Sequence, residues 1–530
     1  MKKLWFRLLL ISASALLLVF SSKSIRGESA GENINTFISN DLPASMQVAG
    51  VALGPLKGLL VDILWWRSER LIENKEFFEA LQLSEWITSL QPTYPSVWNY
   101  QGFNLAFNIS YNFSDLEERW NWIHEGIKLL RNKGIKYNPD WDRNRDIRFE
   151  LVHIFYRKIE GISDKESRKF QDKWTLEMLK YFERGDRAEL EALAEAPKSY
   201  EGLLENAAVK LLEEQYRAQG RDLKMEIDTN PPTYSSLRPY VKENENYNQA
   251  IMEIIFYLKR RAIEKDLNMD VDQILKTDME YGPLDWRTHQ AQIIYWGIVD
   301  EYEKFKLNGS NFSEFVRAAM LSSFYNGRVV FSEKRDYFQR SHNIEILPKL
   351  HNFFDFLLYD SGLDEESREF KRIDLIHKDF LERAIVITYT YNQIEASREL
   401  FEHYELYLPE GHNIKFEQYV IEGFNRSLKV ENTSARRGFL ESMLFKAYQD
   451  AALGEWDRYH GFIKIVKLIH KFHQLKNKDI PAKQLPPLKD IADTARKNYL
   501  ESTGKKESDF STMESQGEKF KTPKKKLATH

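Results

Sequence analysis

Apolar residues recur at intervals of three and four along most of this chain, which is the spacing of one face of an α-helix. The clearest case is the segment 75–92, KEFFEALQLSEWITSLQP, whose apolar face consists of Phe77, Ala80, Leu81, Leu83, Ile87 and Leu90. Pro92 and Pro95 follow, and proline lacks the backbone N–H that a continuing helical turn donates. The pattern therefore predicts a helix that ends near Pro92 and a second helix after it.

The second helix is predicted within 96–113, SVWNYQGFNLAFNISYNF. Gly102 lies one turn beyond Trp98, so a neighbouring helix can approach the backbone closely beside the bulky indole. Together with Ala80 on the preceding helix, this spacing favours a tight helical hairpin. Such a hairpin leaves one face for the next hairpin to cover, as in stacked repeats.

These residues resemble the tetratricopeptide repeat family, whose pattern W-x2-L-G-x2-Y, A-x3-F and P spans about 34 residues. Trp98 and Gly102 take the tryptophan and glycine positions of one unit, and Pro92 takes the proline of the unit before it. The resemblance implies helix packing at Phe77, Ala80, Pro92, Trp98, Gly102 and Leu105. It also implies a concave groove lined by the first helix of each pair, where Asn99 is placed to contact a partner.

The chain as a whole also resembles a group of membrane-anchored bacterial proteins. The segments that carry this resemblance are ILWWRSERL, EWITSLQPTYPSVW and YGPLDWR. It implies attachment to a membrane and no particular activity.

Helical patterning continues to about residue 476 and predicts an all-α fold. Pro92 and Pro139 are 47 residues apart, which is longer than the family period of about 34 residues, so we expect an irregular tetratricopeptide-like α-solenoid. The clearest internal break is NPPTYSSLRP at 230–239, which separates a helical region over 55–229 from one over 240–476. The polar tail 477–530 is expected to be mostly disordered, with one helix at IADTARKNYLES.

Residues 1–26 have the pattern of an export signal, because Lys2, Lys3 and Arg7 precede the uncharged run Leu8–Phe20. No A-x-A cleavage site follows, which favours an uncleaved anchor; removal as a signal peptide and a buried core helix are the alternatives. The charge flanks favour a cytoplasmic N-terminus with the body in the periplasm of a bacterium, tethered to the inner membrane through residues 27–54. Cleavage would instead release the body into the periplasm.

Composition limits the classes of function. A chain of 530 residues exceeds one compact core, so several domains or an elongated array are expected. The net charge of −4 offers no electrostatic case for binding nucleic acid. The sequence contains no cysteine, which excludes disulfides and thiolate chemistry.

A search for catalytic and metal-binding patterns identifies no site. HExxH, P-loop and GxGxxG motifs are absent. His460, His470 and His473 lie on one predicted helix, but no carboxylate completes a ligand set, so core or surface histidines are the favoured interpretation. We therefore predict no catalytic residue, no cofactor and no metal.

Two groups of residues join an aromatic side chain to arginine, a combination common in interface hot spots. They are Trp66, Arg67 and Arg70 in ILWWRSER, and Trp286 and Arg287 in GPLDWR. The alternative is that each tryptophan is core and each arginine pairs with a neighbouring helix. With Asn99 they form the predicted partner-binding set.

The resulting hypothesis is a membrane-anchored, extracytoplasmic scaffold or adaptor for a protein partner. The alternative is an exported hydrolase or binding module for cell-wall or other polysaccharide.

Overall fold

The computed structural model describes residues 56–161, 164–229, 245–298, 311–332, 337–360, 362–426 and 433–519. These residues divide into two compact units. Unit 1 holds the described residues up to Lys276 together with 289–298 and 311–316, and unit 2 holds 277–288 and the described residues from Arg317 onward. The sequence analysis placed the division at 230–239, which lies within unit 1. A proline-rich segment predicts where a helix ends, but it does not predict which helices pack together.

Unit 1 is built from helices, several of which continue into π-helical (η) turns. In chain order they are α3 (Leu56–Glu73), α4 (Phe77–Leu90), α5 (Pro95–Phe103), η2 (Asn104–Ile109), α6 (Leu116–Lys128), η3 (Leu129–Gly134), α7 (Ile135–Tyr137), α8 (Trp141–Ile154), η4 (Phe155–Ile159), α9 (Ser167–Met178), α10 (Arg187–Glu195), α11 (Tyr200–Leu203), α12 (Ala207–Ala218), α13 (Leu223–Thr229), α15 (Glu245–Asp266), α16 (Val271–Tyr281) and α17 (His289–Gly297). α16 and the later α18 (Asn311–Asn326) cross from one unit into the other along the chain.

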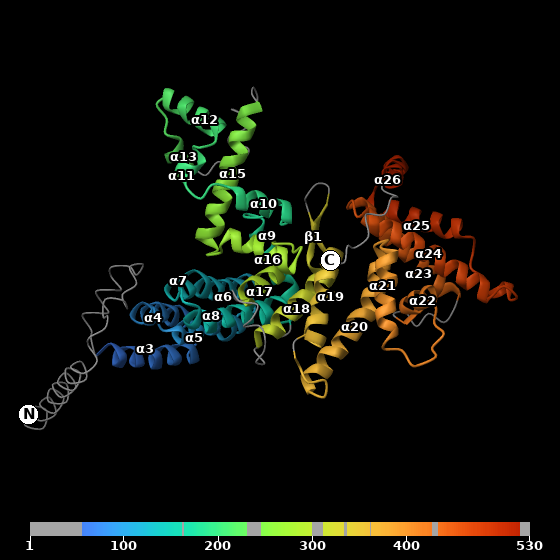
Figure 1. Ribbon diagram of the computed structural model, residues 1–530, viewed down its shortest axis with the longest axis horizontal. Coiled ribbons are helices and arrows are strands. Elements are labelled where there is room, and N and C mark those ends of the chain that lie inside the picture. The colour runs from blue at the N-terminus through green and yellow to red at the C-terminus, as the bar shows by residue number, and fades with distance from the viewer. Residues whose placement is uncertain are drawn as a thin grey trace, which may run out of the picture. The chain divides into compact units, whose positions relative to one another are not determined.

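The first helices of unit 1 form successive layers (Figure 1). α3 packs on α4, α5 with η2 packs on α6 with η3, and η4 packs on α9. Neighbouring layers meet where α5 packs on α8 and where Trp65 of α3 contacts Tyr100 of α5. α17 then packs on α8, η4 and α9, so it adds to the same stack although α10 to α16 intervene in the chain.

Close helix packing in these layers depends on small residues. A Cβ atom on Gly102 would lie 2.6 Å from Cγ of Leu130, and one on Gly126 would lie 3.0 Å from the carbonyl oxygen of Gly102. The carbonyl of Pro92 accepts hydrogen bonds from the indole of Trp98 at 2.7 Å and from the amide of Asn138 at 2.9 Å. All the residues named for repeat packing are buried, namely Phe77, Ala80, Pro92, Trp98, Gly102 and Leu105.

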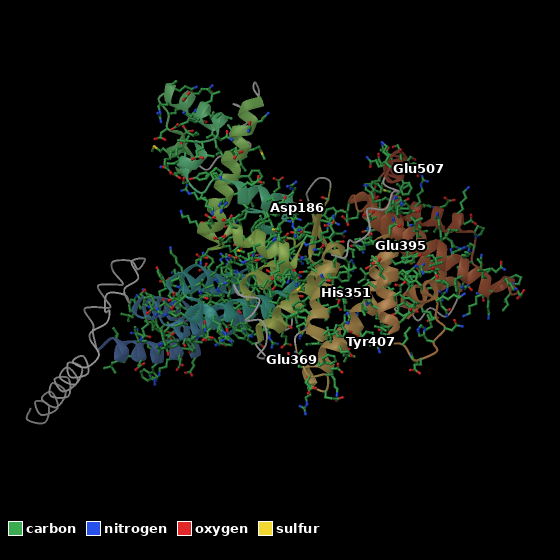
Figure 2. All side chains as sticks on the ribbon, viewed as in Figure 1. Asp186, His351, Glu369, Glu395, Tyr407 and Glu507 are labelled. Atoms are coloured by element: carbon green, nitrogen blue, oxygen red, sulfur yellow. The ribbon has the colours of Figure 1, made fainter. Side chains whose placement is uncertain are left out.

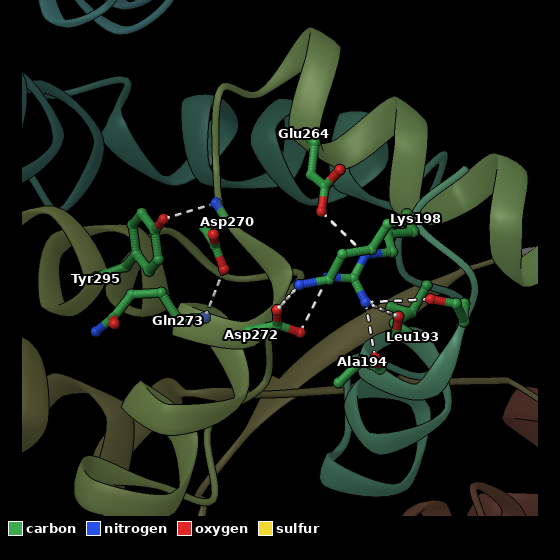
Figure 3. A network of polar contacts seen from close by, with 10 residues as sticks. Leu193, Ala194, Lys198, Glu264, Asp270, Asp272, Gln273 and Tyr295 are labelled. Atoms are coloured by element: carbon green, nitrogen blue, oxygen red, sulfur yellow. Dashed lines mark hydrogen bonds and ion pairs between the residues drawn. The ribbon is translucent and has the colours of Figure 1, made fainter. Parts of the chain in front are cut away.

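A polar network joins α10, α15 and α16 (Figure 3). At its centre is the buried Arg260 of α15. Its guanidinium donates to the carbonyls of Leu193, Ala194 and Ala196 at 3.3, 2.7 and 3.2 Å, at the C-terminal end of α10. Carbonyls at that end have no partner within their own helix and carry the negative end of the helix dipole. Arg260 therefore fixes α15 on α10, and its ion pair with Asp272 at 2.9 Å adds α16.

Unit 2 consists mainly of helices with one short hairpin of strands. Its elements are β1 (Arg328–Phe331), β2 (Phe338–Ser341), η5 (Ile344–Ile346, a 3-10 turn), α19 (Leu347–Asp355), η6 (Phe356–Asp360), α20 (Arg368–Thr390), α21 (Ile394–Glu405), α22 (Phe416–Arg426), α23 (Thr433–Ala452), α24 (Trp456–Lys476), η7 (Pro481–Lys483), α25 (Leu488–Thr503) and α26 (Glu507–Lys519). β1 and β2 pair antiparallel, with Arg328 opposite Ser341. The expectation of a helical protein is confirmed, and the hairpin is an addition that the sequence pattern did not show.

The C-terminal region departs from the expected disordered tail. The helix foreseen at IADTARKNYLES lies within α25, but α26 was not predicted. Phe510 of α26 is buried against Tyr448 and Tyr499, with ring centroids 4.8 and 6.1 Å apart. Because α26 is polar apart from these few contacts, its order comes from tertiary packing that the local pattern does not show.

Among the residues that the structure describes, no helix combines the length and the apolarity needed to cross a bilayer. The predicted anchor 1–26, the tether 27–54 and the basic end of the chain from 520 lie outside the described residues.

Candidate protein-interaction face

A row of aromatic side chains crosses the first three layers of unit 1. We call it the aromatic face and define it as Trp65, Tyr100, Phe103, Phe107, Phe149 and His153. The rings of Trp65 and Tyr100 are 4.2 Å apart between centroids, which links α3 to α5. Phe107 stacks on His153 at 5.1 Å and links η2 to α8. Phe103 is exposed and the other members are half-buried. Phe315 of α18 packs on Phe149 and His153, with ring centroids 5.5 and 6.3 Å apart, so the row is only partly open to solvent.

The local helical period explains why these rings share one side. On α5 and η2, residues 100, 103 and 107 are spaced by three and four, while Val97, Trp98 and Leu105 turn into the core of the unit. The helix thus has two apolar faces. One holds the layers together, and the other carries aromatic rings that the described part of unit 1 leaves partly uncovered.

Ionisable groups border the aromatic face. The hydroxyl of Tyr100 donates to Glu69 at 3.2 Å, and burial, with the nearby Glu69 charge, raises the pKa of Tyr100. Lys158 lies 5.1 Å from the centroid of Phe107 and 3.5 Å from Asp164. Burial lowers the pKa of Lys158, although Asp164 opposes that shift. The face therefore combines flat apolar rings with charge at its edge.

Asn99 lies beside this face on α5 and is half-buried. Its buried Oδ1 atom has no hydrogen-bond partner within the described chain, and neither has Nε2 of Gln101. Buried polar atoms are normally paired, and leaving one unpaired costs about 1–3 kcal/mol. The same helix that presents the aromatic rings thus carries hydrogen-bonding capacity that its own fold does not use.

The other α3 residues of the predicted partner-binding set lie on a different surface. Trp66, Arg67 and Arg70 are exposed, on the side of α3 that faces away from its packed residues Val61 and Leu64. The guanidinium of Arg70 stacks over the indole of Trp66 at 3.9 Å from the ring centroid. The aromatic and guanidinium groups do meet, but they do not join the aromatic face.

Trp286 and Arg287 are not surface residues, which corrects the expectation that they contact a partner. Trp286 is 0% exposed, and its indole donates to Asp278 at 3.1 Å. Arg287 is buried, pairs with Asp285 at 2.7 Å and donates to the carbonyl of Val329 in β1 at 2.9 Å. These groups hold the β-hairpin inside unit 2, so the core alternative for this pair is the correct one.

The histidines considered for metal binding serve other contacts. His460, His470 and His473 each place Nε2 near a backbone carbonyl, at 2.9 Å from Gly517, 2.8 Å from Pro486 and 2.8 Å from Lys483. A carbonyl only accepts, so each imidazole donates and fastens the C-terminal segment to α24. Within the described ranges no group of histidine and carboxylate side chains has the arrangement of a metal site.

A second histidine cluster was not foreseen from the sequence. His351 of α19, His377 of α20 and His403 of α21 gather in unit 2, and Figure 2 marks His351 and the nearby Tyr407. Nδ1 of His377 lies 3.2 Å from the hydroxyl of Tyr407, which donates to Asp374 at 2.7 Å. Burial, together with the two other histidines, lowers the pKa of His377 to about 4. The three residues are far apart in sequence, so no local motif reveals them.

No protein-family model, curated protein or solved structure matches this chain. The functional interpretation therefore depends on the geometry described above.

Proposed function

We propose that this protein is a scaffold or adaptor that binds a protein partner through the aromatic face of unit 1. In this proposal the layered helices form an irregular tetratricopeptide-like α-solenoid, and the apolar segment near the N-terminus holds the body at the outer side of a bacterial inner membrane. Supporting it are the layered packing of α3 to α9 and the export-signal pattern of residues 1–26. Tethering would raise the effective concentration of the gathered partner.

One observation carries the proposal: aromatic rings from three successive layers touch one another and remain partly open to solvent. Aromatic side chains supply large, rigid contact area at low cost in conformational entropy and are enriched in binding hot spots. Asn99, whose Oδ1 has no partner in the described chain, adds polar capacity beside the rings. An extended or helical peptide laid across α3, α5 and α8 would contact all of these groups.

The same face favours a second candidate, a polysaccharide-binding surface. Rows of exposed aromatic rings suit the apolar faces of sugar rings, and Glu69 and Glu150 border the row. Glu150 lies 3.3 Å from Nδ1 of His153. The two candidates make different predictions, because a glycan would change the environment of Trp65 directly.

The test places a photo-crosslinking residue at Asn99 in the full chain, within its native membrane. We expect discrete protein adducts whose yield falls about tenfold when Phe103 is also changed to alanine, the loss typical of one hot-spot residue. The matched control carries the crosslinker at Leu406, which is 81% exposed in unit 2. Identical adducts from both positions, or no protein adduct at Asn99, would reject the scaffold.

The polysaccharide candidate is tested on the purified chain by tryptophan fluorescence with cell-wall glycan fragments. Quenching that disappears in Trp65→Phe, together with an absence of protein adducts at Asn99, would establish the second candidate in place of the first. No quenching would dismiss it.

A further inference from the structure

The outer side of α3 carries an apolar stripe that unit 1 does not cover. Leu59, Ile63 and Trp66 are 60%, 52% and 57% exposed, although all three are large hydrophobic residues. With Arg70 they are spaced by four, three and four residues, which aligns them along one side of the helix. A continuous stripe of this kind differs from the single apolar residues scattered over any protein surface.

The stripe has the heptad spacing of a two-stranded coiled coil. If Ile63 and Arg70 take the a positions, Leu59 and Trp66 take the d positions. Val61 and Ser68 then take the f position, which lies opposite the a and d residues, and both are buried inside unit 1. The burial pattern thus agrees with the heptad: α3 attaches to its own unit by one side and presents the a and d seam to the outside.

α3 is also the first helix of the layers that the structure describes. In arrays of stacked helices the terminal element needs a polar outer face, because nothing covers it. The outer side of α3 is instead apolar and aromatic. It has the composition of a surface that another helix covers.

We propose that α3 pairs in parallel with α3 of a second copy of this chain. In that arrangement Ile63 meets Ile63, Trp66 meets Trp66, and the g residue Asp62 of one copy faces the e residue Arg67 of the other. Two such ion pairs form by symmetry. Both side chains are exposed, and neither makes an ion pair within the described chain, so the charges are free to pair across the dimer.

The charges of the flanking e and g residues also favour one direction of pairing over the other. In an antiparallel pair, equivalent flanks face each other, which would bring Asp62 and Glu69 of one copy against Glu69 and Asp62 of the other. Like charges at close range oppose association, whereas the parallel pair matches acid with base along its flanks. The parallel pair also places Arg70 opposite Arg70 at an a position, and a charged residue at that position lowers the stability of the pair. Parallel pairing also places the segments before residue 56 of both copies at the same end of the seam.

The seam is short. Two heptads bury less than the roughly 1,200 Å² of a standard stable interface, so we expect a weak dimer that is populated at high local concentration. The packing of Arg70 over Trp66 at 3.9 Å closes the seam at its C-terminal end. The surface is distinct from the aromatic face, so self-association and partner binding do not compete for the same residues.

Disulfide trapping tests the contact, because the chain has no cysteine of its own. Leu59→Cys in the full chain, oxidised in membranes, is expected to give a disulfide-linked dimer, since parallel d residues meet their own copies. Tyr111→Cys is the control in the same unit; Tyr111 is 79% exposed but lies outside the stripe. An equal yield from both variants, or no dimer from Leu59→Cys, would overturn the parallel pairing.

Charge reversal tests the ion pairs in the same assay. Asp62→Arg or Arg67→Asp, each combined with Leu59→Cys, is expected to lower the dimer yield at least threefold. The double reversal Asp62→Arg with Arg67→Asp should restore it, because the pair is then rebuilt with its signs exchanged. If the double variant stays low, the proposed flank contact is wrong. Crosslinking at Asn99 in the Asp62→Arg variant reports separately on the partner face and should be unchanged.

Discussion

The two units differ in the surroundings of their buried histidines. Unit 1 buries Arg131, Arg260, Lys158 and His289, and it surrounds them with carbonyls and carboxylates, Glu160 in the case of His289. Unit 2 also buries arginine, for example Arg287, but its buried His377 and half-buried His342 lie against tyrosine hydroxyls. The difference is chemical: an arginine must keep its charge and needs partners, whereas a histidine can enter a core by giving up its proton.

The consequence is a difference in acid sensitivity. Burial lowers the pKa of Arg131 to about 10, so it remains charged at neutral pH. Burial raises the pKa of Glu189, but Lys259 and backbone N–H groups outweigh that effect and leave the pKa below its usual value. The partners of Glu189 therefore favour its ionised form. The histidines His377 and His342 of unit 2 are neutral in the folded unit, so unit 2 loses stability as the pH falls below 6.5, where the unfolded chain binds protons more readily.

The largest effect of a single substitution is expected for Arg260→Leu in unit 1. It removes donors from the carbonyls of Leu193, Ala194 and Ala196 and ends the ion pair with Asp272. Losing these buried interactions should cost about 3 kcal/mol of unfolding free energy. Urea unfolding, monitored by hydrogen exchange in peptides of α10 and α15, measures this loss of unfolding free energy.

The matched control is Lys198→Ala, which removes the other cation on Asp272, at 2.6 Å. Its side chain is 70% exposed, so the loss should not exceed about 0.5 kcal/mol. Equal losses from both variants would show that burial does not decide the strength of these pairs. If Arg260→Leu also destabilised peptides of unit 2, its effect would not be confined to unit 1.

The second effect is the acid sensitivity of unit 2. Burial lowers the pKa values of His377 and His342 to about 4, against 6.5 for an exposed histidine. Between pH 6.5 and 4 the unfolded state binds more protons, so stability is complete above pH 6.5 and falls as the pH falls through this window. Each histidine should remove roughly 3 kcal/mol by pH 4. Hydrogen exchange at pH 7 and pH 4.5 should show unit 2 opening first.

His377→Phe sharpens this result. The imidazole packs against Phe354 and Phe380, with centroids at 4.8 and 6.5 Å, so a phenyl ring suits the site. In this variant the unfolding free energy of unit 2 should depend less steeply on pH, by the contribution of one histidine. The stability of unit 1 should not change. An unchanged slope would mean that His377 is protonated in the folded unit.

The smallest effect concerns a histidine that has a hydrogen-bond acceptor. His460 donates to the carbonyl of Gly517 in α26 at 2.9 Å. His460→Ala should weaken the attachment of α26 by about 1 kcal/mol, the net value of one hydrogen bond. Faster exchange in peptides covering 507–519 reports the change, and His460→Gln, which retains a donor, should recover part of it. Equal exchange in all three proteins would assign α26 to apolar packing alone.

The periodic sequence predicted what depends on neighbouring residues. The helix from Phe77 to Leu90 and its end before Pro92 follow from apolar spacing and from a missing backbone donor. Close helix approach was predicted at Gly102, and Leu130 occupies the space that a Cβ atom on Gly102 would need. The contact of Arg70 with Trp66 also depends only on local spacing, because residues four apart share a helix face.

Only the tertiary structure decided which apolar faces are covered. Trp286 and Trp66 each adjoin an arginine in the sequence, yet one is enclosed beside the β-hairpin and the other is open on α3. α17 joins the early layers across a long intervening segment, and the histidines of α19, α20 and α21 meet although they are distant in the chain. The physical reason is that a local pattern fixes the direction of a side chain on its helix, whereas burial depends on which distant helix arrives to cover it.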